Sequence, residues 1–99
     1  VSATASGTVT RAGWVDGYGY LVEVQHDGDI TTRYGHNSAI LVTEGQQVEQ
    51  GTILALVGST GNSTGPHCHY EVRIHGDAVD PTYFLPGNDC SRAGASLLF

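Results

Sequence analysis

The chain has 99 residues, with ten acidic side chains, four arginines and no lysine, which gives a formal net charge of −6. This charge balance argues against nucleic acid as a partner, because proteins neutralise phosphates with Lys and Arg. Hydrophobic residues make up 39% of the chain and charged residues 14%, which is typical of one small folded domain. No apolar run has membrane-spanning length and no signal peptide is recognisable, so no membrane insertion is expected.

Short strand-like segments separated by glycine follow one another along the chain. In the second of them, Tyr20, Val22 and Val24 are expected on one face, and Leu21, Glu23 and Gln25 on the other. Residues 52–57 form a nearly continuous apolar run, which predicts a strand buried on both faces. The segments expected as strands, in chain order, are 7–14, 18–26, 30–36, 40–42, 52–57 and 67–74.

Turn signals connect these segments. Asp27-Gly28 predicts a hairpin turn, and His75-Gly76-Asp77 predicts another. No segment has helical periodicity over more than a few residues. The sequence therefore predicts an all-β, antiparallel domain, built as two packed sheets or a partly open barrel, over residues 1–86, with a C-terminal tail at 87–99.

The chemically most informative stretch is His67-Cys68-His69, which follows a glycine-rich loop at 58–66. Side chains alternate across a strand, so the two imidazoles share a face and lie about 6–7 Å apart along it. Both can reach one metal ion, or one can bind it while the other faces an open coordination position. Taken alone, the pair is a weak signal that favours two histidines on a solvated face over a metal site.

The other histidines give weaker signals. His36 ends a strand and on its own predicts a surface or capped residue, while His26 and His75 stand beside turns and are expected to be solvated. Neither cysteine lies in a CxxC pair, which argues against a zinc ribbon. Cys68 and Cys90 can form a disulfide in an exported protein, or Cys68 can be a small core residue. Both alternatives stay open.

Several ordered motifs resemble a known family. These motifs are Tyr34-x-His36, Gly45-Gln46-x-Val48-x-x-Gly51, the segments 57–61 and 63–66, His67-x-His69-x-Glu71-Val72-Arg73, and the ending at 76–85. With them, the stretch 31–73 strongly resembles the M23 metallopeptidases, which are lysostaphin- and LytM-like cell-wall endopeptidases. The resemblance covers about residues 3–86.

The resemblance implies a small antiparallel β-structure whose groove is floored by a zinc site. It implies that His69 is a zinc ligand and that His36 and His67 are non-ligand catalytic histidines beside the metal-bound water. The implied activity is zinc-dependent hydrolysis of peptide bonds in bacterial peptidoglycan. The implied location is extracellular and cell-wall facing, in a secreted or virion-associated protein, with peptidoglycan peptides as partners and a larger polypeptide or a phage-tail assembly as a compatible context.

One departure from the family pattern stands out. The family's other two ligands, a histidine and an aspartate, precede the strand that begins here near Ala3, so they are expected upstream of Val1. The chain can be the C-terminal portion of a longer enzyme, or the ligands can come from another chain or segment. Alternatively, it is a degenerate, non-catalytic module that binds wall peptides or regulates another hydrolase. The presence together of His36, His67 and His69 favours the first explanation.

Overall fold

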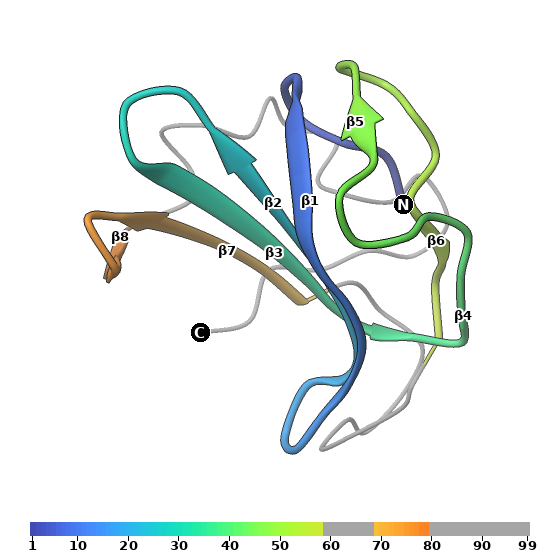
Figure 1. Ribbon diagram of the computed structural model, residues 1–99. Coiled ribbons are helices and arrows are strands. Elements are labelled where there is room, and N and C mark those ends of the chain that lie inside the picture. Colours follow the sequence, from blue (N-terminus) through green and yellow to red (C-terminus); the bar gives the residue numbers. More distant parts are fainter. Residues whose placement is uncertain (59–68, 80–99) are drawn as a thin grey trace.

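The computed structural model describes residues 1–58 and 69–79, which form two antiparallel sheets (Figure 1). The larger sheet has the strand order β5-β1-β2-β3-β7-β8, and the smaller one pairs β4 with β6. The all-β antiparallel prediction is confirmed. The strands are β1 (Gly7–Val15), β2 (Gly19–His26), β3 (Ile30–Asn37), β4 (Ala39–Ile40), β5 (Gln47–Val48), β6 (Ala55–Leu56), β7 (His69–Ile74) and β8 (Asp77–Val79).

Some predictions fall outside these residues: His67, both cysteines, the boundary at 86 and the tail 87–99. Within the described ranges, no helix is long and apolar enough to cross a membrane.

Both predicted hairpin turns are present. Gly28 and Asp29 have φ angles of 76° and 59° between β2 and β3. His75 and Gly76 have φ angles of 52° and 84° and form the two-residue loop between β7 and β8, which suits a type I′ turn because two positive φ angles match the strand twist. His75 is an exposed turn residue, as expected, and its Nδ1 lies 2.8 Å from Asp29 Oδ2.

The hydrophobic core packs against one face of the large sheet. In β2, Val22 and Val24 belong to it, in line with the predicted alternation. At the start of this strand, the predicted alternation gives the wrong burial for Tyr20 and Leu21. Leu21 is fully buried, and Tyr20 is 39% exposed because it lies at the hairpin end, edge-on to Trp14. The core residues are Ala3, Val9, Val22, Val24, Tyr34, Val42, Val48, Leu54, Ala55, Tyr70 and Val72.

The apolar run at 52–57 is not a strand buried on both faces, so that prediction is wrong. Only Ala55–Leu56 pairs as a strand, with β4. Leu54 and Ala55 are fully buried, whereas Ile53 is 58% and Leu56 51% exposed. The physical reason is that a two-stranded sheet covers the core with one side only.

His26 is not a solvated turn residue, which corrects a second expectation. It is the last residue of β2 and is half-buried, with Nδ1 2.7 Å from the Ser6 carbonyl oxygen and Nε2 2.8 Å from Thr32 Oγ1. Thr32 continues this chain of contacts to the Tyr34 hydroxyl at 2.9 Å. Thr4 Oγ1 extends it, because this atom lies 3.1 Å from the Tyr34 hydroxyl and 3.0 Å from that of Tyr70. His26 therefore joins the N-terminal segment to a buried polar network.

The close approach of β1 to β2 at Gly7 gives a stability prediction. A Cβ atom on Gly7 would lie 2.3 Å from the Gln25 carbonyl oxygen and 2.8 Å from Val24 Cγ1. We expect Gly7→Ala to lower the free energy of unfolding by about 1–3 kcal/mol, measured by urea denaturation, because overpacking forces backbone shifts. Gly13→Ala in the same strand is the matched control, since its Cβ would meet no atom within 4 Å. Equal effects of the two substitutions would contradict the steric explanation.

Candidate functional site

His36 lies at an irregularity in β3. Tyr20 pairs with Asn37 and Val22 with Tyr34, so one residue of β2 faces two residues of β3, Gly35 and His36. This is a β-bulge, a feature that re-aims side chains and is common near active sites. His36 has a φ of 61°, which non-glycine residues rarely adopt, and it lies outside a hairpin turn. Such backbone strain is concentrated at functional sites.

The bulge brings two of the predicted site residues together. His36 ends β3 and His69 begins β7, and Gly35 pairs with His69 across the two strands. The two imidazole rings have centroids 5.5 Å apart at an interplanar angle of 79°. His36 is 5% exposed, and its backbone N–H donates to the Tyr18 carbonyl oxygen at 2.6 Å. The histidine pair is therefore placed by backbone contacts among the end of β3, the start of β7 and the loop between β1 and β2.

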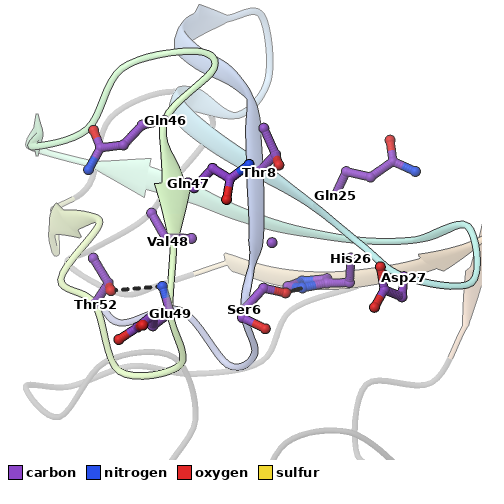
Figure 2. Close-up of a pocket in the computed structure, with 11 residues that line it drawn as sticks. Ser6, Thr8, Gln25, His26, Asp27, Gln46, Gln47, Val48, Glu49 and Thr52 are labelled. Atoms are coloured by element: carbon purple, nitrogen blue, oxygen red, sulfur yellow. Dashed lines mark hydrogen bonds between the residues drawn. The ribbon is translucent and has the colours of Figure 1, made fainter.

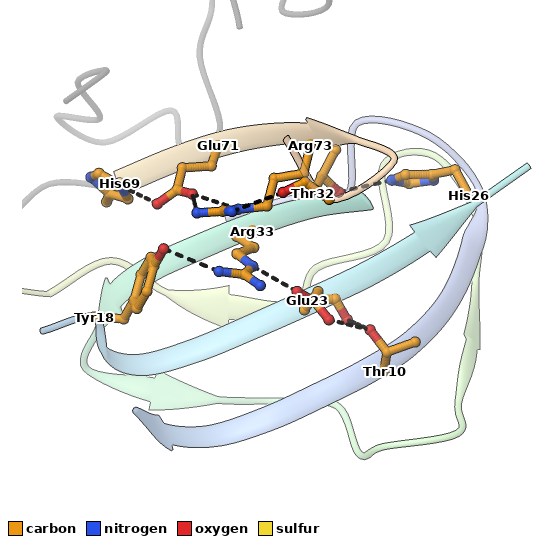
Figure 3. Close-up of polar contacts among 10 residues, drawn as sticks. Thr10, Tyr18, Glu23, His26, Thr32, Arg33, His69, Glu71 and Arg73 are labelled. Carbon is orange, nitrogen blue, oxygen red and sulfur yellow. Dashed lines mark hydrogen bonds and ion pairs between the residues drawn. The ribbon is translucent and has the colours of Figure 1, made fainter. Parts of the chain in front are cut away.

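A buried carboxylate determines how His69 is held. His69 Nε2 lies 2.7 Å from Glu71 Oε2, and Arg73 donates through Nη2 and Nε to Glu71 Oε1 at 2.9 and 3.1 Å (Figure 3). Burial alone would raise the pKa of Glu71, but hydrogen bonds from His69, Tyr18 and Arg73 outweigh it and lower the pKa to about 2. An ionised carboxylate only accepts, so His69 Nε2 is the donor in this contact.

The site continues into a row of charges across the sheet. Strand register aligns Arg11, Glu23, Arg33 and Glu71 across β1, β2, β3 and β7, with alternating sign. Arg33 Nε donates to Glu23 Oε2 at 2.6 Å, as Figure 3 shows. Opposite charges in register support a sheet. These charged residues make the face of the large sheet away from the core polar. Their row ends at Glu71, which contacts His69.

One described cleft is separate from this site. It has a volume of about 870 Å³ and lies where β5, β1 and the end of β2 meet (Figure 2). Gln25 on its wall pairs with Thr31, which is five residues from His36, or about 16 Å along β3. Neither His36 nor His69 lines it. The lining residues are Ser6, Gly7, Thr8, Gln25, His26, Asp27, Gln46, Gln47, Val48, Glu49 and Thr52.

Sequence reasoning identified only part of this arrangement. His36 and His69 are adjacent, and His67 lies outside the described residues. Within residues 1–58 and 69–79, no group of three or more His, Cys, Asp or Glu side chains could hold a metal ion. The roles of Glu71 and Tyr18 were missed. Strand alternation could have indicated Glu71, because it stands two residues after His69 on the same face.

The fold and the site define a class of protein. It is an antiparallel β-sheet module with two adjacent histidines at one end of its polar face, one of which contacts a carboxylate. The model of peptidase family M23 matches residues 1–81. The chain belongs to this family.

Relatives of this chain include enzymes and activators. It is 47% identical over 94 residues to the DD-carboxypeptidase/endopeptidase Mpg of Neisseria meningitidis serogroup B, a match that covers 94% of this chain and 22% of Mpg. It is 42% identical over 85 residues to the murein hydrolase activator EnvC of Escherichia coli, a match that covers 86% of this chain and 20% of EnvC. The chain thus spans about a fifth of the length of the curated relatives it matches.

The fold also matches a solved enzyme. The structure of the antimicrobial peptidase lysostaphin from Staphylococcus simulans superposes with a TM-score of 0.83 at 34% identity, covering 95% of this chain and 42% of that one. This likeness confirms the expected family and fold.

Proposed function

We propose that this chain is the catalytic part of a zinc-dependent endopeptidase that hydrolyses peptide bonds in bacterial peptidoglycan. The observation that carries the proposal is the placement of His36 beside His69, with His69 held at Nε2 by Glu71, in a chain of peptidase family M23. The 47% identity to an enzyme named DD-carboxypeptidase/endopeptidase supports it. The proposed location is extracellular and cell-wall facing.

His69 fits a role as one zinc ligand. Histidine ligands to zinc commonly donate their second ring N–H to a carboxylate, which fixes the tautomer and raises ligand basicity. Glu71 provides this contact at 2.7 Å and leaves the lone pair on Nδ1. Zinc supplies Lewis-acid activation of the scissile carbonyl and of a water molecule. The remaining ligands, a histidine and an aspartate, are expected from a segment of the full-length protein that precedes Val1.

His36 and His67 are the proposed catalytic histidines. An imidazole has an unperturbed pKa near 6.5, so it can accept a proton from an attacking water or donate a hydrogen bond to a developing oxyanion near neutral pH. His36 suits this role because its ring lies beside that of His69 and its strained backbone fixes its direction. The role of His67 is proposed from the sequence motif alone.

A second candidate function is a non-catalytic module that binds wall peptides or activates another hydrolase. The observation that favours it is the 42% identity to a protein named murein hydrolase activator. In that case the histidine pair would be part of a binding surface, and no bond would be cleaved by the protein alone.

Digestion of purified peptidoglycan by the full-length protein tests both functions. We expect mass spectrometry of the released muropeptides to show new peptide termini that a zinc chelator abolishes. An activator would release no new termini alone but would increase release by a separate wall hydrolase. That second pattern would overturn the endopeptidase proposal.

A further inference from the structure

Asn37 directly follows His36 and is the last residue of β3. It is fully buried, with 0% exposure. Its Nδ2 donates to the Tyr34 carbonyl oxygen at 2.8 Å and to the Tyr20 carbonyl oxygen at 2.9 Å. A side-chain amide nitrogen carries two hydrogens, so these contacts use both of them. One buried side chain therefore joins two backbone segments beside the candidate site.

The two carbonyl groups that Asn37 contacts flank the β-bulge. Tyr34 pairs with Val22 on one side of the bulge, and Tyr20 pairs with Asn37 on the other. The amide thus spans the two bulged residues within β3 and also crosses to β2. A bulge disrupts the regular ladder and leaves its extra residue unpaired. Here a side chain supplies hydrogen bonds to the backbone at the point where the ladder is irregular.

The chain is also fixed directly after Asn37. The N–H of Ser38 donates to the Leu56 carbonyl oxygen at 2.9 Å, which begins the connection to the small sheet. A Cβ atom on Gly58 would lie 2.5 Å from Ser38 N, so the segment that follows β6 packs closely against this residue. Strained backbone persists only where the surrounding structure over-determines it. These contacts provide that support for His36 and its φ of 61°.

We propose that Asn37 is a positioning residue for the reaction: its amide holds the bulge and so keeps the His36 imidazole beside that of His69. This inference rests on the proposed function. Without the amide, the carbonyl groups of Tyr20 and Tyr34 lose a donor, and an unpaired polar group inside a protein is costly. The bulge is then expected to rearrange. A register change of one residue turns a side chain to the opposite face of a sheet, which would separate the two histidines.

The test compares Asn37→Leu, which has nearly the same size but no donor, with wild type in the full-length protein. Thr32→Val is the matched control, because it removes a buried hydroxyl that donates to Tyr34 from the same strand but makes no contact across the bulge. Nuclear Overhauser contacts between the His36 and His69 rings, whose centroids are 5.5 Å apart, report the pairing without metal or substrate. Steady-state cleavage of peptidoglycan fragments separates kcat from KM.

For Asn37→Leu we expect the ring contacts between His36 and His69 to disappear. We also expect kcat to fall by about 10- to 100-fold and KM to stay within about threefold of wild type, because a misplaced proton-transfer group slows the chemical step but not substrate binding. Thr32→Val should retain the ring contacts and kcat, although both substitutions lower the midpoint of thermal unfolding. In the wild type, both side-chain amide protons of Asn37 should exchange slowly with solvent.

Three results would overturn the inference. They are rapid exchange of the Asn37 amide protons, a folded Asn37→Leu protein that keeps the ring contacts or a kcat within about threefold of wild type, and equal losses in Thr32→Val. If Asn37→Leu does not fold, Asn37→Ser, which is smaller and still polar, takes its place in the same comparison. If the wild-type protein cleaves no peptidoglycan, the proposed function fails, and the ring contacts alone decide whether Asn37 positions His36.

Discussion

Replacing His69 with alanine is expected to abolish zinc binding and peptidoglycan cleavage by the full-length protein. Structural zinc sites with four ligands bind with about 10–16 kcal/mol, so one ligand contributes on average about 2.5–4 kcal/mol, or roughly 10²–10³-fold in affinity. The variant also leaves Glu71 without the N–H that it accepts at 2.7 Å. Zinc content by elemental analysis and muropeptide release by mass spectrometry measure the two effects.

The matched control is His75→Ala, at an exposed turn histidine at the far end of β7. It should retain wild-type zinc content and cleavage. Circular dichroism and thermal unfolding should show that His69→Ala is folded. A folded His69→Ala protein that keeps one zinc per chain would contradict the ligand role of His69.

The second large effect is expected at His36, where chemistry and backbone strain must be separated. Asparagine tolerates the left-handed conformation that His36 adopts, with φ of 61°, but it cannot exchange a proton near neutral pH. We therefore expect His36→Asn to lower kcat by about 10²–10⁴-fold, the range for loss of a general acid or base. Zinc content and thermal stability should stay close to wild type, because His36 is proposed as a non-ligand.

His75→Asn is the control for this substitution, since His75 also has a positive φ, of 52°, and lies in a turn. It should not change kcat. Cleavage by His36→Asn within about threefold of wild type would contradict a catalytic role. Loss of zinc from the folded variant would instead indicate that His36 is a ligand.

The sequence alone predicted the fold class, because this depends on local patterns, whereas His36 and His69 were singled out together only through the resemblance to the M23 metallopeptidases. Glycine-bounded segments and the Asp27-Gly28 and His75-Gly76 turns predict short antiparallel strands, and the order of motifs identifies His36 and His69. The meeting of β3 and β7 at Gly35 and His69 depends on pairing between distant segments, which only the resemblance implied.

The rest depends on features that periodicity does not encode. The bulge at Gly35-His36 shifts register by one residue, and nothing in the alternation of β3 indicates it. Tyr18 reaches the site only because its hairpin loop folds over Gly35. His26 could point to solvent or to the polar network, and a strand-end position does not decide between them.

Titration of the metal-free full-length protein with zinc, while peptidoglycan cleavage is followed, tests the central claim most directly. The metal-free protein should be inactive, and cleavage should rise with added zinc to a plateau at one ion per chain. Cleavage that is already complete without metal, or that stays absent at saturating zinc in a folded protein, would contradict the assignment of the His36–His69 site to a zinc-dependent peptidase.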